Sequence, residues 1–338
     1  MDLIISTKNG LYCPKAQIYI DPYGKVDKAI ITHGHADHAR PNHGAYLCTT
    51  SARPIIQFRL TNRAKIETLN YGQKLNINGV DFSFHPAGHI LGSAQIRIAY
   101  KGEIWVVSGD YKTEDDGFCA PFEPVKCNTF ITESTFALPI FNWQPQHLIF
   151  EEMNNWWRTN QQNGITSVVC AYSLGKSQRI IQNLDHNIGN IYCNAAIENT
   201  NQVIRNQGIN LKPTIALKGN ISRSELEGQL VMITPNAMGT AAIRKLRPFT
   251  TASSSGWMML ENKNFGGRVD KGFVLSDHAD WKGLLWAIKQ TGAERILVTH
   301  GYTNAFAQYL NENGFVASTI DTHFEQMKTK STNSPIVV

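Results

Sequence analysis

Four side chains that can bind a metal ion lie within six consecutive residues near the N-terminus. They are His33, His35, Asp37 and His38, and they follow the apolar run 29–31. At the end of a strand, His33 and His35 stand two residues apart and can project to one side, while Asp37 and His38 reach a second point as the chain turns into a helix. Imidazole and carboxylate together suit zinc, manganese or iron. The segment predicts a metal site, because a histidine-rich surface turn has no reason to show this spacing.

Further ligands are expected in the same setting, which is a polar residue just after an apolar strand. The segments that fit this description end in or near His89, Asp110, Glu133, His278 and His300. Any one of them alone is equally well explained as an ordinary strand end. Strands that all end in His, Asp or Glu instead predict a sheet with converging polar side chains at one edge. That arrangement indicates a dinuclear metal centre.

The predicted ligands form two sets that share one bridging carboxylate. The sets are His33, His35 and His89 for the first ion, and Asp37, His38 and His300 for the second. Asp110 would bridge the ions, because a carboxylate has two oxygens to share. Asp27, on the preceding segment, could accept a ring N–H from a ligand histidine or be a solvated turn residue. Two divalent ions are expected, with zinc preferred and manganese or iron as alternatives.

The elements that must position these ligands change in character along the chain. Up to about residue 135, short β-branched or aromatic runs alternate with Gly, Asn and Pro turns, which is typical of strands. A helical apolar stripe follows over 148–157, and a strand over 166–170 leads into a helix that begins near Gly175. Apolar strands over 273–276 and 296–299 return to the first pattern. The middle of the chain is therefore predicted to be an insertion.

The composition is that of a globular protein. The chain has 338 residues, of which 42% are hydrophobic and 17% charged, and this excludes disordered and collagen-like classes. No window approaches the roughly 20 apolar residues of a membrane helix, and the first residues do not form a secretory signal, so we expect a soluble, cytoplasmic protein with no membrane partner. The six cysteines contain no CxxC pair and are predicted to be free thiols.

The positive charge is concentrated in the middle of the chain. Residues 140–273 hold 13 Lys and Arg against 8 Asp and Glu, whereas the rest of the chain holds 19 of each. This asymmetry permits nucleic acid as a partner, although a soluble basic face would look the same. Gly175-Lys176-Ser177 is no ATP-binding loop, because Cys170 stands where that motif needs glycine. Lys176 and Ser177 could still meet a nucleic-acid phosphate at a helix start, or form a solvated cap.

The whole set of motifs resembles one superfamily. His33 to His38 is similar to the HxHxDH signature of the metallo-β-lactamase superfamily, and His89 and Asp110 fit its later motifs. Glu133, His278 and His300 resemble the three further motifs of the β-CASP nuclease branch. The resemblance implies an α/β fold, namely an αββα sandwich with an inserted β-CASP α/β domain. The expected parts are residues 1–139 of the sandwich, the insertion over 140–273, and a return segment and tail over 274–338.

Longer segments resemble the bacterial ligase-associated DNA exonucleases, whose older name is RNA 3′-end processing factor-like. These segments are 87–94, 133–139 and 270–281. The resemblance implies a metal-dependent phosphodiesterase, a DNA exonuclease in DNA repair, with DNA preferred over RNA and with a DNA ligase and a helicase as partners. This sequence differs from the family pattern at the extra serines of 253–255 and at 262–268. Because 262–268 has few basic residues, the sequence leaves undecided whether this segment contacts nucleic-acid phosphates.

The implied mechanism is hydrolysis by a hydroxide that two metal ions activate for in-line attack on phosphorus. Asp37, Glu133 and His278 are the predicted catalytic residues. His278, oriented by Glu133, would donate either a hydrogen bond to a phosphate oxygen or a proton to the leaving oxygen, and the sequence leaves both open. The first alternative is an RNA-processing nuclease of the same fold. The second is a metallo acyl hydrolase, but such an enzyme needs no basic insertion. The third is a non-catalytic nucleic-acid-binding subunit, but such a subunit does not need the complete set of metal ligands.

Overall fold

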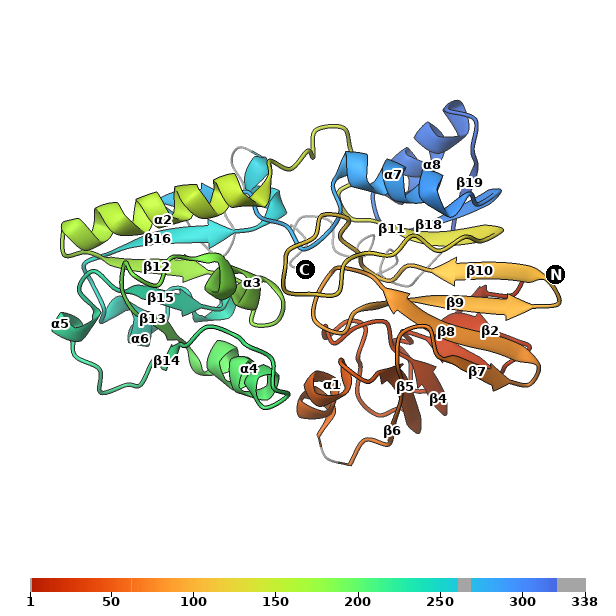
Figure 1. Ribbon diagram of the computed structural model, residues 1–338, viewed down its shortest axis with the longest axis horizontal. Coiled ribbons are helices and arrows are strands. Elements are labelled where there is room, and N and C mark those ends of the chain that lie inside the picture. The colour runs from red at the N-terminus through yellow and green to blue at the C-terminus, as the bar shows by residue number, and fades with distance from the viewer. Residues whose placement is uncertain (1, 62, 261–268, 321–338) are drawn as a thin grey trace. The chain divides into compact units, whose positions relative to one another are not determined.

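The computed structural model describes residues 2–61, 63–260 and 269–320. The chain divides into two compact units (Figure 1). The first contains the residues up to Phe141 and those from His278 onward, and the second is Asn142–Asp277. The predicted tail lies outside the described residues. So does segment 262–268, for which the sequence leaves contacts with nucleic-acid phosphates undecided.

The described residues of the first unit form two mixed sheets and three helices. One sheet has its strands in sequence order: β1 (Ile5–Thr7), β2 (Gly10–Cys13), β3 (Ile18–Ile20), β4 (Lys28–Ile30), β5 (Ala45–Thr49) and β6 (Ile66–Leu69). The other has the order β19 (Val316–Thr319), β18 (Arg295–Gly301), β11 (Thr129–Ser134), β10 (Glu103–Val107), β9 (Ala94–Tyr100), β8 (Val80–Pro86) and β7 (Lys74–Ile77). The helices are α1 (Arg53–Leu60), α7 (Trp281–Thr291) and α8 (Thr303–Glu312).

These elements form four layers, because alternate strand residues point to opposite faces. Along β10, Trp105 and Val107 pack into the core between the two sheets, whereas Val106 packs on the outer face with residues of α7 and α8. On the outer face of the other sheet, Ala29 of β4 packs with Ile56 of α1. The order helix, sheet, sheet, helix is the αββα sandwich, so the predicted fold class is confirmed.

Parallel pairing brings several predicted site residues to one edge of a sheet. Strand β11 is parallel to both β10 and β18, so the carboxyl ends of these three strands point the same way. Asp110 follows β10, Glu133 lies near the end of β11, and His300 lies near the end of β18. The strands therefore position all three side chains from their carboxyl ends.

The second unit contains a parallel sheet with helices. Its strand order is β14 (Ile215–Ala216), β13 (Ile191–Cys193), β15 (Leu230–Ile233), β12 (Thr166–Cys170), β16 (Phe249–Ser254) and β17 (Lys271–Phe273). The helices are α2 (Gln146–Gln162), α3 (Lys176–Asn183), α4 (Ala195–Arg205), α5 (Arg223–Leu226) and α6 (Ala241–Arg244), with 3-10 turns at Pro235–Ala237 and Gly256–Met259. The predicted apolar stripe lies on α2, which buries Ile149, Met153 and Trp157, whereas Leu148 is exposed.

The end of the second unit differs from the sequence-based boundary after Phe273. Strand β17 pairs with β16, so residues 271–273 complete the parallel sheet of the second unit. The predicted strand over 273–276, which was expected to return to the first unit, is therefore wrong. Arg179 of the second unit bonds to Ser276 and Asp277, and residues 274–277 belong to that unit as well.

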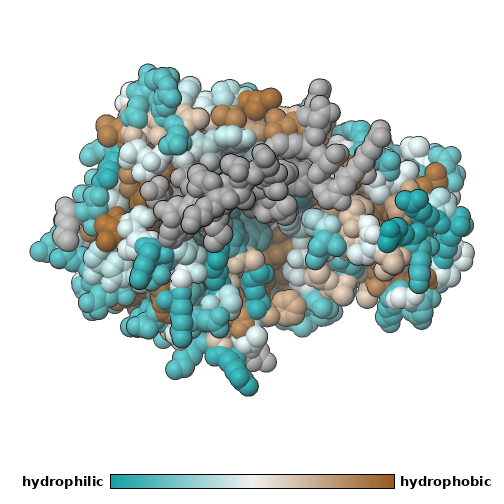
Figure 2. Space-filling view, turned by 180° about the vertical axis from the view of Figure 1, so that it is seen from behind, coloured by the Kyte–Doolittle hydropathy of each residue, from teal (hydrophilic) through white to brown (hydrophobic). Residues whose placement is uncertain are grey.

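Neither a membrane helix nor a disulfide occurs among the described residues. None of the helices there combines the length and the apolar character that crossing a bilayer requires. On the face drawn in Figure 2, hydrophobic residues are scattered among hydrophilic ones. None of the six cysteines forms a disulfide within the described residues, and five of the six are buried.

Candidate metal centre

The first four ligand candidates lie on a turn after β4. The amide of Ala39 donates to the carbonyl of His35 at 2.8 Å, and the chain makes a single turn over 34–39. The predicted helix at Asp37 and His38 is therefore wrong. Pro41 explains why the turn stops, because proline disfavours helical backbone at the residue before it.

Three imidazoles converge at the predicted first metal position. Nδ1 of His35 lies 3.1 Å from Nε2 of His33 and 3.1 Å from Nε2 of His89. Zinc–nitrogen bonds of about 2.0–2.1 Å in tetrahedral geometry would place neighbouring nitrogens roughly 3.3 Å apart. Together with Asp110, these residues form a group whose ligand atoms all lie within 4.8 Å of one another. The donor set and its spacing fit a divalent metal ion.

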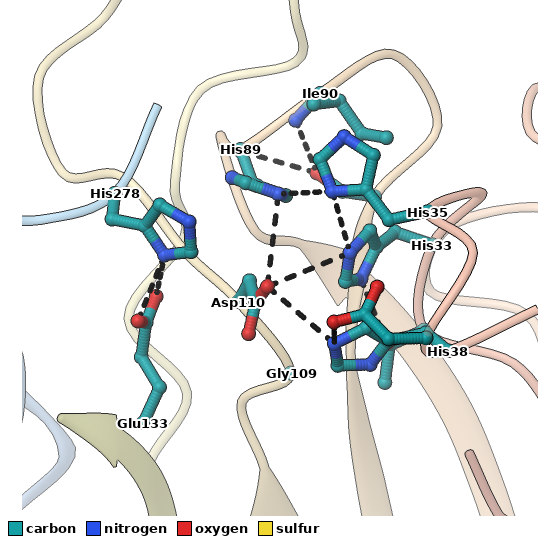
Figure 3. Close-up of polar contacts among 12 residues, drawn as sticks. His33, His35, His38, His89, Ile90, Gly109, Asp110, Glu133 and His278 are labelled. Carbon is teal, nitrogen blue, oxygen red and sulfur yellow. Dashed lines mark hydrogen bonds and ion pairs between the residues drawn. The ribbon is translucent and has the colours of Figure 1, made fainter. Parts of the chain in front are cut away.

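Asp110 lies between the two predicted ligand sets. Its Oδ2 is 3.6 Å from Nε2 of His33 and 3.9 Å from Nε2 of His89, both of the first set, and 3.5 Å from Nε2 of His38, of the second (Figure 3). The carboxylate is buried. One oxygen that faces imidazoles of both sets has the position that a bridging ligand needs.

The second set leaves a buried nitrogen that a metal ion would satisfy. Nε2 of His38 is buried and makes no hydrogen bond within the described part of the chain, although it lies 3.7 Å from Oδ2 of Asp37. The ring of His300 is 6.3 Å from the ring of His38, centre to centre. Asp37, His38, Asp110 and His300 line one pocket. An unsatisfied buried nitrogen beside two carboxylates favours a cation at this position.

Burial and neighbouring charges set the protonation of the cluster. Burial holds the pKa of His33 well below its usual value. Burial would also lower the pKa of His38, but the carboxylates of Asp110, Asp37 and Asp21 raise it well above the ordinary value. The pKa of Asp110 is well below its usual value, since His38 outweighs burial. Neutral His33 and ionised Asp110 are the forms that coordinate metals.

His278 is held by Glu133. Its Nδ1 lies 2.8 Å from Oε2 and 3.0 Å from Oε1 of that carboxylate (Figure 3). Glu133 is held in turn, because it accepts hydrogen bonds from the amide of Tyr111 at 2.8 Å and from the hydroxyl of Thr135 at 2.5 Å. The ring of His278 lies 4.7 Å from that of His89. The His278 ring is therefore held through Nδ1 beside the predicted metal ligands.

Comparisons with known proteins find relatives of this chain. No protein-family model matches the chain. It is 26% identical over 316 residues to a probable DNA ligase of Opitutus terrae, which covers 93% of this chain and 30% of that protein. It is 25% identical to the cleavage and polyadenylation specificity factor subunit 3-I of Arabidopsis thaliana, over 67% of this chain and 41% of that protein. The endoribonuclease YSH1 of Saccharomyces cerevisiae is 30% identical over 123 residues, 36% of this chain and 16% of that protein. The names of these relatives are consistent with the predicted β-CASP branch of the metallo-β-lactamase superfamily.

A crystal structure of a protein of unknown function from Enterococcus faecalis shares the fold, with a TM-score of 0.61 and 13% identity over 87% of this chain and 79% of that one. The chain spans less than half the length of each curated relative just named. The relatives include proteins named as an endoribonuclease and as a cleavage and polyadenylation specificity factor, and the described residues contain a His/Asp group that could hold a metal ion.

The carboxylate that bonds to a predicted ligand histidine is Asp21, and the prediction of Asp27 is wrong. Asp27 is exposed. Asp21 places Oδ2 at 2.7 Å from Nδ1 of His38, and its Oδ1 accepts the amide of Thr32 at 2.8 Å. The sequence carried a usable signal, because Asp21 directly follows the apolar strand β3, which runs parallel to β4.

Lys176 and Ser177 do not form the predicted phosphate contact. Nζ of Lys176 lies 3.2 Å from Oδ2 of Asp277, and the lysine is 4% exposed. The hydroxyl of Ser177 is buried and donates to the carbonyl of Tyr172 at 2.5 Å. That prediction is wrong because the ammonium is paired, and the hydroxyl bonded, inside the second unit.

Proposed function

We propose that this β-CASP nuclease is a DNA exonuclease that acts in DNA repair. The observation that carries the proposal is the match to the protein named probable DNA ligase, which covers 93% of this chain but only 30% of that protein. A segment similar to this chain is thus part of a protein named for joining DNA. This supports DNA as the substrate and a DNA ligase as a partner. A helicase as a second partner rests on the family resemblance alone, and a cytoplasmic location agrees with the lack of a disulfide within the described residues.

An RNA-processing nuclease is the second candidate. It is favoured by the relatives named endoribonuclease YSH1 and cleavage and polyadenylation specificity factor, which match this chain over shorter stretches. The same centre would serve both substrates, because DNA and RNA present the same phosphodiester group to it.

The residues that would hold two zinc ions are those of the two ligand sets with Asp110 between them. The sets are His33, His35 and His89, and Asp37, His38 and His300. When bound, such ions act as Lewis acids on the phosphate and on water. Asp37 adds a carboxylate whose pKa is lowered, since His38 and other histidines outweigh the effect of burial, so it stays ionised at neutral pH.

His278 supplies the group that acts on the substrate directly. Glu133 holds its Nδ1, so a proton on that nitrogen is directed at the carboxylate and Nε2 is presented to the phosphodiester. From there it donates a hydrogen bond to a phosphate oxygen or a proton to the leaving oxygen. The two roles differ in one measurable way, because only proton donation becomes dispensable when the leaving group is a weak base.

The test is digestion of end-labelled nucleic acids. The protein, supplied with zinc or with manganese, is incubated with single-stranded DNA, duplex DNA and RNA that carry the label at either end. We expect mononucleotides from one end of DNA, and no product from the Asp110→Ala variant. Internal cuts in RNA with intact DNA would replace the proposal with the RNA-processing candidate. Cleavage of thioesters or lactams, with every nucleic acid intact, would exclude both.

A further inference from the structure

The second unit buries a group of charged side chains that the proposed chemistry does not use. Lys176 and Arg179 lie at the start of α3, and Asp277 ends the unit. Nζ of Lys176 is 3.2 Å from Oδ2 of Asp277, and Nη1 of Arg179 is 3.4 Å from Oδ1. Their exposures are 4%, 2% and 4%. Buried charges are tolerated only when they are paired, and removing one partner is costly, so this group fixes the positions of its members.

Arg179 also holds the backbone and a second segment. Its Nη1 donates to the carbonyl of Ser276 at 2.5 Å, and its Nε and Nη2 donate to Oε1 of Gln146 at 2.9 and 2.7 Å. Gln146 lies near the beginning of the second unit, and Ser276 and Asp277 lie at its end. One guanidinium therefore anchors both segments through which the chain enters and leaves this unit.

The anchored end of the unit is covalently joined to the proposed catalytic imidazole. His278 follows Asp277 directly, and the two share a peptide bond. The ring of His278 is held through Nδ1 by Glu133, while before it Arg179 holds the carbonyl of Ser276 and Lys176 holds the carboxylate of Asp277. A misplacement of about 1 Å in a reacting group costs roughly 100-fold in rate, so a residue that holds the adjoining backbone can affect the rate.

We propose that Asp277, held by Lys176 and Arg179, is a positioning residue for His278. This inference rests on the proposed catalytic role of His278. It also gives Lys176 a function that its burial allows, in place of contact with nucleic acid.

The first experiment separates positioning from binding. Lys176→Met removes one cation and leaves Asp277 paired with Arg179, so the variant keeps a partner for the buried carboxylate. We expect kcat on DNA to fall about 10- to 100-fold with KM unchanged, and Lys176→Arg to restore most of it. The matched control is Arg205→Met, which removes the 3.1 Å ion pair to Glu198 in the same unit, and it should keep the wild-type kcat. A rise in KM with kcat unchanged would return Lys176 to a substrate contact and overturn the inference.

A double-mutant cycle shows whether the effect passes through His278. In a His278→Ala background, Lys176→Met should cause no further loss, because the residue that it positions is absent. Equal losses in both backgrounds would mean a general structural role and would overturn the inference. If Lys176→Met does not fold, Arg179→Lys serves instead, since it keeps the charge and removes the planar fork that bonds Ser276.

A readout without catalysis keeps the inference separate from the proposed function. In protein labelled with ¹⁵N-histidine, NMR follows the Nδ1 proton of His278 that faces Glu133. Lys176→Met should speed the exchange of this proton with water, and Arg205→Met should leave it unchanged. Unchanged exchange in Lys176→Met would overturn the inference even if the protein is an active nuclease. Faster exchange in a protein that cleaves no nucleic acid would support the positioning effect while the proposed function fails.

Discussion

Oδ2 of Asp21 lies 2.7 Å from Nδ1 of His38, so this carboxylate orients the imidazole whose other nitrogen faces Asp37 and Asp110. The same Asp21 accepts hydrogen bonds from the amide and the hydroxyl of Thr32, at 2.8 and 2.5 Å. A residue outside the two predicted ligand sets therefore holds the ring of a predicted ligand and the backbone next to His33.

Asp21→Asn should weaken metal binding without unfolding the protein. If the amide oxygen keeps the bond from the amide of Thr32, its NH2 group faces Nδ1 of His38 and cannot accept the ring N–H. Loss of such a partner lowers metal affinity by about 10- to 100-fold. Titration of the metal-free protein with zinc measures this affinity. The control is Asp27→Asn, an exposed position that should bind as the wild type does. Equal affinities in the two variants would contradict the role of Asp21.

Asp110→Ala should abolish hydrolysis and lower the metal content, because Oδ2 faces the imidazoles of both ligand sets. Elemental analysis of the purified variant measures the metal, and circular dichroism checks that the fold is retained. A wild-type rate in the variant under metal-depleted conditions would be incompatible with a dinuclear centre.

His278→Ala should keep the metal content of the wild type and cleave slowly. The imidazole bonds to Glu133, and neither predicted ligand set includes it. Loss of a general acid or of a transition-state hydrogen bond costs about 10²- to 10⁴-fold in rate. Comparison of DNA with bis(p-nitrophenyl) phosphate separates the two roles, since only proton donation loses its importance with the activated ester. Loss of a metal ion from this variant would instead make His278 a ligand.

Gly109→Ala should disturb the metal centre more than an equivalent change elsewhere. Gly109 has φ +57°, and an added Cβ would lie 2.8 Å from Cβ of Thr32. Gly102 also has a positive φ, +88°, but a Cβ there meets nothing within 4 Å. Both changes strain the backbone by about 1–2 kcal/mol. Only Gly109→Ala should also lower the zinc content, and thermal melts with metal analysis compare the two.

The cysteines should react unequally with thiol reagents. Burial raises the pKa of the thiols of Cys48, Cys127, Cys170 and Cys193 to about 12, so they stay protonated at pH 8. Cys119 is only partly buried. Native protein should therefore release about one equivalent of thionitrobenzoate from Ellman's reagent, and Cys119→Ser should release almost none. Reaction of several thiols before unfolding would contradict the packing around them.

The candidate metal ligands could be predicted from the sequence because several of them lie close together along the chain. His33, His35, Asp37 and His38 are brought together by one short turn, so their spacing alone indicates a shared ligand. The rule that parallel strands end at one edge extended the prediction to more distant residues. It applies to Asp110, Glu133 and His300 because β10, β11 and β18 run in parallel.

Tertiary structure decided which charged side chains pair with one another. Asp21 and Asp27 are the same residue type and lie at the two ends of the segment that joins β3 to β4, but the parallel pairing of these strands brings only Asp21 to His38. Lys176 has the local pattern of a phosphate-binding lysine, yet Asp277, which is distant in sequence, neutralises it. Side-chain types and spacing thus determined what chemistry the chain can carry. The partner of each charge depended on long-range packing, because an electrostatic interaction depends on distance in space and not on separation along the chain.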